Sequence, residues 1–417
     1  MISVAEAQKI ILSEITVLAE ERVLLPDALG RTLCENILSP LNHPPWDTSA
    51  MDGYAVRYAD TKTASRDKAI QLKIIEEIPA GTLPQKTVGE GQAAKIMTGA
   101  PLPQGADAIV MVEETEKNGD TATIFAAPEP GEFIRRKGEG IHEGECILKK
   151  GLRLRAPEIA LMASVGKAVV PVYQRPTVAI LSTGDELADL DEPRGPDKIL
   201  NSNGYGLAAQ VMETGAIPIN LGIAKDNKAH LMAKMRAGLG ADFLLISGGV
   251  SMGDYDFVIE VLEALEVTMK FWKVAMKPGQ PLAFGTRGAQ PIFGLPGNPV
   301  SSMVSFEQFV RPALLKASGR TQILRPVITA ILEEDFSKQP GRQQFVRSVV
   351  SVKDGAYRVR STGNQGSAIL KSLVLANAFM ILPPEGDTLK AGEKVAVQLL
   401  SEIADTLGNE SSTSAAG

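Results

Sequence analysis

Apolar residues follow two different rhythms along this chain of 417 residues. Near the start they recur at helical spacing, which predicts a helix over residues 3–19: Val4, Ala7, Ile11, Ile15 and Leu18. Ser3 can cap this helix, and Glu6 follows three residues later, as in a capping box. Residues 23–28 then read as a short strand and turn, and residues 29–37 as a second short helix.

Residues 45–140 change to short apolar runs separated by Gly, Pro and Asp turns. The runs cover residues 72–75, 93–97, 108–112 and 121–125. This pattern predicts a mostly β domain. Residues 141–173 return to loops with a helix near residues 156–164. We therefore expect residues 1–44 and 141–173 to form one split N-terminal linker domain, into which the β domain is inserted.

Strand and helix patterns alternate most clearly in residues 174–324. The expected strands cover residues 177–181, 217–221, 243–246 and 291–293, and the expected helices residues 204–214, 228–239, 257–264 and 300–317. Such alternation predicts an open, mostly parallel, doubly wound α/β sheet. Residues 325–404 return to short strands, as in a small β-barrel or sandwich. The tail, residues 405–417, is rich in Ser, Ala and Gly and is expected to be disordered.

Composition narrows the class of protein without naming a function. Hydrophobic residues make up 44% and charged residues 22% of the chain, as in ordinary globular proteins. The net charge of −6 argues against nucleic-acid and anionic-membrane partners. Two cysteines exclude a disulfide framework and fit a reducing cytoplasm. No signal peptide or membrane span is expected, and the three histidines show no zinc-ligand spacing.

Three loops leave the predicted parallel strands at one edge, where α/β sheets bind ligands. Glycines let backbone N–H groups approach a ligand, helix N-termini add a positive dipole end, and serines add hydroxyl groups. Together they predict a cradle for phosphate or another oxyanion, although ordinary strand-to-helix turns use the same residues. No Walker A pattern occurs. The candidates are Thr183, Gly184, Asp185, Ser247, Gly248, Gly249, Ser251, Gly253, Pro296, Gly297, Asn298 and Ser301.

Charged residues cluster around the same loops. Carboxylates beside a phosphate site suggest Mg²⁺, and capping of helix N-termini explains them equally well; the candidate ligands are Asp185, Glu186 and Asp256. Lys273 and Lys277 could neutralise an oxyanion or form a solvated surface pair. Taken alone, Asp52 fits a turn residue and a catalytic residue equally well, the segment around Thr98 reads as a plain turn, and Arg347 is expected at the surface.

These segments resemble the molybdopterin molybdenumtransferase (MoeA) family, whose relatives include the gephyrin E domain. The resemblance rests on these motifs, in this order: PPWDTSAMDGYAV, IMTGAPLPQGADAIVMVEE, LSTGDEL, SGGVSMGDYDF, FWKVAMKPGQP, GLPGNPVSSMVSFE and TGNQGS. It implies a four-domain elongated protomer with a molybdopterin-binding α/β domain and a C-terminal β-barrel. It also implies a homodimer that uses adenylated molybdopterin and molybdate, releases AMP and is assisted by Mg²⁺ or a similar ion.

The resemblance assigns roles to positions that match family motifs. Catalytic roles are implied for Asp52, Thr98, Glu186, Asp226, Asp256, Lys273 and Lys277. Arg347 and Ser367 match functional positions of the C-terminal β domain. In the family dimer, Asp52 and Thr98 face the partner's α/β domain. Two positions depart from the family pattern. Gly140 stands where the family often has an acid, whose role Glu139 could take, and Gln280 stands where some members carry lysine.

Other readings stay open at this point. A non-catalytic pterin-binding scaffold would keep the fold without turnover, and a pterin adenylyltransferase shares the α/β domain. Tungstate could take the place of molybdate. The molybdopterin adenylyltransferase and recipient molybdoenzymes are the expected transient partners.

Overall fold

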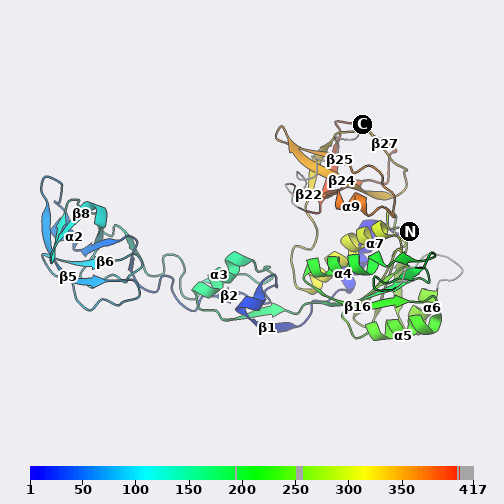
Figure 1. The fold of residues 1–417 in the computed structure, drawn as a ribbon, viewed down its shortest axis with the longest axis horizontal. Helices are drawn as coiled ribbons and strands as arrows, with labels where there is room; N and C mark the ends of the chain where they lie inside the picture. The colour runs from blue at the N-terminus through cyan, green and yellow to red at the C-terminus, as the bar shows by residue number, and fades with distance from the viewer. Residues whose placement is uncertain (193–194, 250–256, 402, 404–417) are drawn as a thin grey trace.

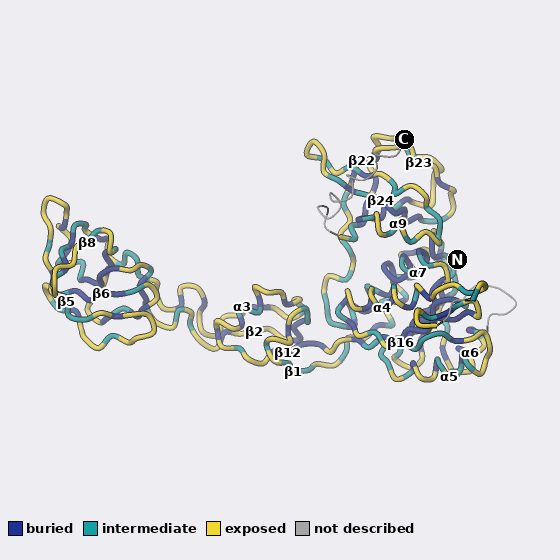
Figure 2. Tube along the Cα trace, in the orientation of Figure 1, coloured by how far each residue is buried: buried dark blue, intermediate teal, exposed yellow. Residues whose placement is uncertain are grey.

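The computed structural model describes residues 1–192, 195–249, 257–401 and 403. The molecule is elongated, with a β domain at one end, a narrow linker in the middle, and an α/β domain beside a β-barrel at the other end (Figure 1). Buried segments are concentrated inside these parts, as Figure 2 shows. The described helices include none that is both long and apolar enough to cross a membrane. This arrangement confirms the predicted multidomain α/β fold.

The first helix packs against the α/β domain. Helix α1 (Val4–Glu14) begins at Ser3, whose side chain accepts a hydrogen bond from the Glu6 amide (3.1 Å), as predicted. It ends at Glu14, five residues before the predicted residue 19, because Ile15 is already extended. Its apolar face joins the core of the α/β domain, although the sequence grouped this segment with the linker.

The linker is held together by pairing between segments far apart in the sequence. Strand β1 (Glu20–Leu24) pairs antiparallel with β12 (Val169–Tyr173). The 3₁₀ turn η1 (Leu25–Ala28) and α3 (Ala156–Ser164) pack beside them. The helix predicted over residues 29–37 is wrong. That segment instead leads into β2 (Ile37–Leu38), which pairs with β11 (Cys146–Leu148). The local sequence pattern does not reveal this pairing, because the partner strand lies more than one hundred residues away.

The inserted domain is a six-stranded sheet with an apolar cluster on each side. Its strand order is β7-β4-β6-β5-β9-β8. The strands are β4 (Gly53–Val56), β5 (Ile70–Ile78), β6 (Gln92–Ile96), β7 (Ala108–Met111), β8 (Thr115–Asn118) and β9 (Thr121–Ile124). Around it lie β3 (Thr48–Ser49), β10 (Ile134–Arg135), α2 (Tyr58–Thr61) and η2 (Val112–Glu114). Each of the four predicted apolar runs falls on a strand of this sheet, to within one residue at its end.

The α/β domain contains the predicted parallel sheet, extended by an antiparallel edge. Its order is β16-β13-β17-β21-β20-β18, and the first four strands are parallel. They are β16 (Ile217–Ala224), β13 (Thr177–Thr183), β17 (Phe243–Ser247) and β21 (Gln290–Leu295). Strands β20 (Ala283–Arg287) and β18 (Thr268–Trp272) were not predicted.

Helices cover both faces of this sheet, which confirms the doubly wound arrangement. One face carries α1, α4 (Ser202–Thr214), α7 (Pro299–Ser305) and α8 (Arg311–Ala317), with a π-helical turn over Phe306–Val310 between the last two. The other face carries α5 (Lys228–Gly238) and α6 (Phe257–Ala264). A short parallel pair, β14 (Leu187–Ala188) and β15 (Ile199–Leu200), lies beyond the end of β13.

The C-terminal domain is a closed five-stranded barrel, one of the two folds expected from its short strands. Its strands are β22 (Val327–Leu332), β24 (Gln343–Lys353), β25 (Ala356–Ser361), β26 (Ala378–Leu382) and β28 (Lys394–Leu399), and pairing of β24 with β26 closes the ring. Strand β19 (Met276–Lys277), from the α/β domain, adds to β24. The remaining elements are β23 (Phe336–Ser337), β27 (Thr388–Leu389) and α9 (Lys371–Val374).

Candidate functional site

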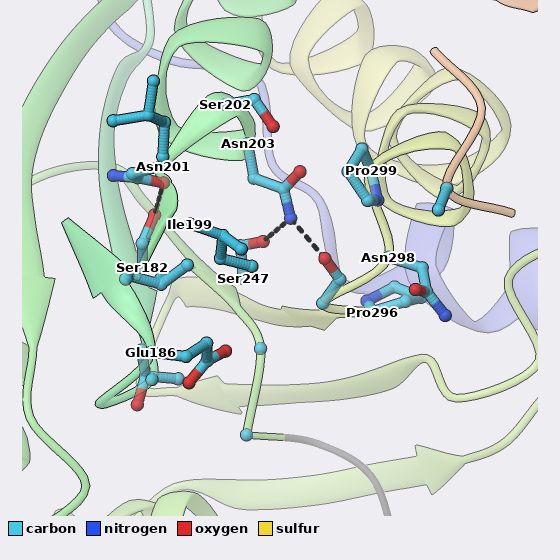
Figure 3. Close-up of a pocket in the computed structure, with 18 of the residues that line it drawn as sticks. Ser182, Glu186, Ile199, Asn201, Ser202, Asn203, Ser247, Pro296, Asn298 and Pro299 are labelled. Atoms are coloured by element: carbon cyan, nitrogen blue, oxygen red, sulfur yellow. Dashed lines mark hydrogen bonds between the residues drawn. The ribbon is translucent and has the colours of Figure 1, made fainter. Parts of the chain in front are cut away.

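The three predicted loops meet around one cavity of about 660 Å³ at the carboxyl edge of the parallel strands. Its lining includes Thr183, Gly184 and Glu186 from the first loop, Ser247, Gly248 and Gly249 from the second, and Pro296, Gly297 and Asn298 from the third. Figure 3 shows these loops facing one another across the cavity. The adjacency of β13, β17 and β21 in the sheet explains the convergence.

The first loop is tied to the end of the neighbouring strand β16. The Thr183 hydroxyl donates to Oδ1 of Asp226 (2.9 Å), and the Asp185 amide donates to Oδ2 of Asp226 (3.3 Å). The Asp226 amide in turn donates to Oδ1 of Asp185 (3.2 Å). Glu186 differs, because its carboxylate is exposed and accepts no hydrogen bond from the described residues. It is therefore the acid of this loop with the most oxygen lone pairs free for a ligand.

The second loop requires a glycine at position 248. Its φ is +93°, in the left-handed region, and a Cβ there would lie 2.6 Å from the Thr183 carbonyl oxygen. The Gly248 amide also donates to the Leu295 carbonyl (3.1 Å), which draws the second loop toward the third. The predicted residues Ser251, Gly253 and Asp256 lie outside the described part of the chain.

Asn201, Ser202 and Asn203 also line the cavity and were not among the predicted residues. Asn201 caps α4 by accepting from the Gly204 amide (3.0 Å), and it accepts from the Ser182 hydroxyl (2.8 Å). Asn203 joins the other two loops, because its Nδ2 donates to Ser247 Oγ (2.9 Å) and to the Gly297 carbonyl (2.8 Å; Figure 3). An asparagine just before the predicted helix over residues 204–214 was the available signal.

Ser301 lies in the first turn of α7 and is buried, and it is not among the residues that line the cavity. The Ser367 carbonyl accepts from the Val300 amide (3.0 Å), which joins the barrel's polar turn to the same helix. Ala368, the next residue, lines the cavity. The barrel therefore contributes to the rim of the α/β site.

A second cavity, of about 400 Å³, lies where β19 meets the barrel. Its described lining contains the cations Lys277, Lys338 and Arg347 and no acidic residue. Gln365 lines this cavity and Ala368 lines the first, so one short segment reaches both. Lys273 is not among the lining residues, and its amide donates to the Leu282 carbonyl (2.9 Å).

Arg347 was expected at the surface from its own sequence context, and this expectation is wrong. It is 1% exposed. Its guanidinium donates to the Ser372 hydroxyl (3.1 Å) and to the Gly366 carbonyl (3.1 Å), and it forms no ion pair with a described carboxylate. Burial lowers the pKa of Arg347 to about 10. A buried cation without an acidic partner is costly, and a bound anion would compensate its charge.

Asp52 and Thr98 contact each other in the inserted domain. The Thr98 amide and hydroxyl both donate to Oδ1 of Asp52, at 2.7 Å and 2.8 Å. These bonds, the backbone one first, hold the pKa of Asp52 below its usual range. Both residues are exposed. Their domain lies at the opposite end of the molecule from the α/β domain, so one chain does not bring this pair to either cavity (Figure 1).

Gly140 and Glu139 occupy the segment where the family often has an acid. At Gly140, which replaces the family acid, a Cβ would lie 3.3 Å from the His43 carbonyl oxygen. The carboxylate of Glu139 accepts from the Arg136 amide (2.8 Å), so it is already used to close its own turn. Among the described residues, no three His, Cys, Asp or Glu side chains are grouped so as to hold a metal ion.

Comparison with known proteins covers nearly the whole chain. Three family profiles match: "MoeA N-terminal region (domain I and II)" over residues 2–166, "Probable molybdopterin binding domain" over residues 179–316, and "MoeA C-terminal region (domain IV)" over residues 329–400. The molybdopterin molybdenumtransferase of Nostoc sp. is 40% identical, over 89% of this chain and 86% of its own. The Bacillus subtilis protein of the same name is 38% identical, over 92% and 90%.

Solved structures agree with the sequence comparisons. Two crystal structures of the molybdopterin biosynthesis MoeA protein of Pyrococcus horikoshii superpose with TM-scores of 0.82 and 0.81. Their sequences are 33% and 32% identical to this chain, and the matches cover 96% of this chain and all of each of theirs.

Proposed function

The chain belongs to the MoeA family, and from this we infer that it is a molybdopterin molybdenumtransferase, an enzyme of molybdenum cofactor biosynthesis. The first cavity is the observation that best supports this activity. Three strand-to-helix loops converge there, at the edge of the sheet at which α/β proteins bind ligands. Its substrates on this proposal are adenylated molybdopterin and molybdate, and AMP is released.

The adenylated pterin would bind in the first cavity. Backbone N–H groups at glycine-rich loops and helix N-termini suit phosphate oxygens. The cavity's apolar lining, which includes Ile199, Leu200 and Pro296, suits a heterocycle. Thr183, whose hydroxyl is fixed by Asp226, would keep the first loop in the conformation that admits the phosphates.

The carboxylates of this cavity fit Mg²⁺ or a similar ion in chemistry. Mg²⁺ is commonly held by one or two carboxylates together with substrate phosphates, so a cage made only of protein groups is not required. Glu186 would be its main ligand, because both carboxylate oxygens of Asp226 already accept hydrogen bonds. When bound, the ion would neutralise charge on the phosphate groups.

Molybdate would bind in the second cavity. It is a tetrahedral dianion, and Lys277 and Arg347 supply positive charge in a lining without described acids. The segment from Gln365 to Ala368 reaches both cavities, which would place the oxyanion next to the pterin site. The smaller volume of this cavity, about 400 Å³ against about 660 Å³ for the first, and its cations favour a small, highly charged ligand over a bulky one. Tungstate has the same shape and charge and would bind in the same way.

Asp52 and Thr98 would act on the active site of a second copy. Their exposed position, far from the cavities of their own chain, supports a homodimer with composite sites. An Asp held ionised by two donors is a weak base, so its charge suits a ligand-exchange role better than proton transfer. The cytoplasm is the proposed compartment. The adenylyltransferase that supplies the substrate and the recipient molybdoenzymes are the proposed transient partners.

AMP release from adenylated molybdopterin, measured with and without molybdate, tests this function directly. Release that depends on molybdate is expected. A pterin adenylyltransferase would instead consume ATP with free molybdopterin, and a scaffold would bind the pterin without turnover. Either of these results would refute the proposed activity. Glu186→Gln should abolish the molybdate-dependent release, with Asp191→Asn, which changes an exposed acid of the neighbouring loop, as the matched control.

A further inference from the structure

Lys338 is a buried cation in the second cavity to which no sequence motif drew attention. The residue lines the cavity, as Arg347 does, and it is 9% exposed. The ammonium group donates to three backbone carbonyls of one loop, those of Pro383 (2.7 Å), Glu385 (2.5 Å) and Gly386 (2.7 Å). A lysine ammonium has three N–H donors, so its hydrogen-bonding capacity is fully used.

The charge of Lys338 nevertheless remains. Carbonyl dipoles stabilise an ammonium group without cancelling its unit charge. Glu385 and Asp387 belong to the same loop, but both are exposed and neither forms an ion pair with Lys338 among the described contacts. Arg347, on the same cavity, also has no acidic partner among the described residues. In such a poorly solvated place, charges act over longer distances than in water.

We propose that Lys338 is a fixed charge that makes the second cavity prefer dianions over monoanions, without itself contacting the ligand. The inference rests on the proposed function, in which this cavity holds molybdate. The three cations of this cavity would then have different roles in binding the oxyanion. Lys277, exposed on β19, is free to contact an oxyanion. Arg347 lines the cavity with its guanidinium held by Ser372 and Gly366, and Lys338 acts only through its field.

This role has a signature that a structural role lacks. The Coulomb energy between a fixed charge and a ligand is proportional to the ligand's charge. Removing the charge should therefore weaken a dianion by the square of the factor by which it weakens a monoanion of the same shape. Collapse of the loop over residues 383–386 would instead weaken both anions by a similar factor.

Molybdate and perrhenate provide the matched pair, because both are tetrahedral oxyanions of closely similar size, one doubly and one singly charged. Their dissociation constants would be measured by titration calorimetry at fixed ionic strength. The variants are Lys338→Met, which removes the charge, and Lys338→Arg, which keeps it. If perrhenate binding to Lys338→Met weakens about threefold, molybdate binding should weaken roughly ninefold. The ratio of the two constants within one variant does not depend on the fraction of folded protein.

Lys353→Met is the control for general surface charge. Lys353 is exposed at the far end of β24, six residues beyond Arg347, which is roughly 20 Å along a strand. That distance exceeds the Debye length of about 8 Å at physiological salt. The ratio to compare is the dissociation constant for perrhenate divided by that for molybdate. We expect this ratio to fall in Lys338→Met and to stay at the wild-type value in Lys338→Arg and Lys353→Met.

Other outcomes separate the inference from the function beneath it. An unchanged ratio in Lys338→Met, or an equal fall in Lys353→Met, would overturn the role of Lys338 and leave the oxyanion site intact. If the wild-type chain binds neither anion, the oxyanion site itself is refuted, and the role of Lys338 with it. Molybdate-dependent AMP release, measured separately, would then show whether the transferase activity survives that failure.

Discussion

Replacing Gly248 by alanine should destabilise the α/β domain more than the loss of a glycine alone would do. An L-residue in the left-handed region costs about 1–2 kcal/mol. In addition, the new Cβ would lie 2.6 Å from the Thr183 carbonyl oxygen, where ordinary contact begins at 3.4 Å. Overpacking of this kind typically adds about 1–3 kcal/mol. We therefore expect the free energy of unfolding to fall by about 2–5 kcal/mol in total.

Two control variants separate these contributions. Gly288→Ala has a positive φ of 56° with nothing within 4 Å of the added Cβ, so it carries only the backbone cost. Gly297→Ala lies on the same cavity, but its Cβ would meet only the Gly248 Cα at 3.6 Å, an ordinary contact. The predicted order of destabilisation is Gly248→Ala, then Gly288→Ala, then Gly297→Ala.

Tryptophan fluorescence allows the unfolding of this domain to be followed by itself. The chain has two tryptophans, Trp46 in the inserted domain and Trp272 on β18 of the α/β domain. In a Trp46→Phe background, urea unfolding monitored at Trp272 reports the α/β domain. Equal stability losses in Gly248→Ala and Gly288→Ala would refute the close approach of the second loop to Thr183. The Gly248→Ala protein that remains folded should also bind adenylated pterin more weakly, because relief of the contact moves Thr183.

Three further predictions concern the charged residues. Asp52→Asn and Glu186→Gln should each abolish molybdate-dependent turnover while the chain stays folded. If the two variants are mixed in equal amounts and exchange subunits, about a quarter of the wild-type rate should return, because half of the dimers are mixed and each mixed dimer has one intact site. No restoration would refute a site shared between copies. Asp52 stays ionised as the pH falls because its pKa is lowered. Thr98→Val removes one donor, so it should raise the pKa of Asp52 and move the acidic limb of the pH–rate profile to higher pH. An unmoved limb would argue against a role for ionised Asp52 in the reaction. Arg347→Met should weaken molybdate binding at least tenfold by calorimetry, with pterin binding unchanged, whereas an equal loss of both would indicate a general collapse of the barrel junction.

The sequence predicted best where local pattern and burial coincide. The parallel strands β13 and β17 are continuous apolar runs because both of their faces are covered by helices. The loops that follow them could be placed at one edge from topology alone. Strands β18 and β20 were missed, since their polar and mixed sequences signal a strand only through pairing with a neighbour.

Residues brought together by distant segments could not be found from the sequence. The segment over residues 29–37 looks helical, but its backbone pairs with strands more than a hundred residues away. Lys277 joins Lys338 and Arg347 around one cavity because β19 of the α/β domain adds to a barrel strand. Asn203 gains its importance from bonds to residues 44 and 94 positions further along the chain. Motifs identify such residues only when a family resemblance already assigns them a role.

The separation of charge along the molecule supports a site shared between two copies. The ionised Asp52, held by Thr98, lies on the inserted domain. The cations of the second cavity, which form no ion pair with a described carboxylate, lie at the other end, beyond the linker. The linker is a paired structure with its own apolar core, so it fixes the spacing between these ends better than a flexible tether would. An acid held outward at a set distance cannot reach the cavities of its own chain, but it can be matched to those of a second copy that lies antiparallel to it across a two-fold axis. On this reasoning, weakening the pairing of β1 with β12 should lower turnover without changing the affinity of either cavity for its ligand.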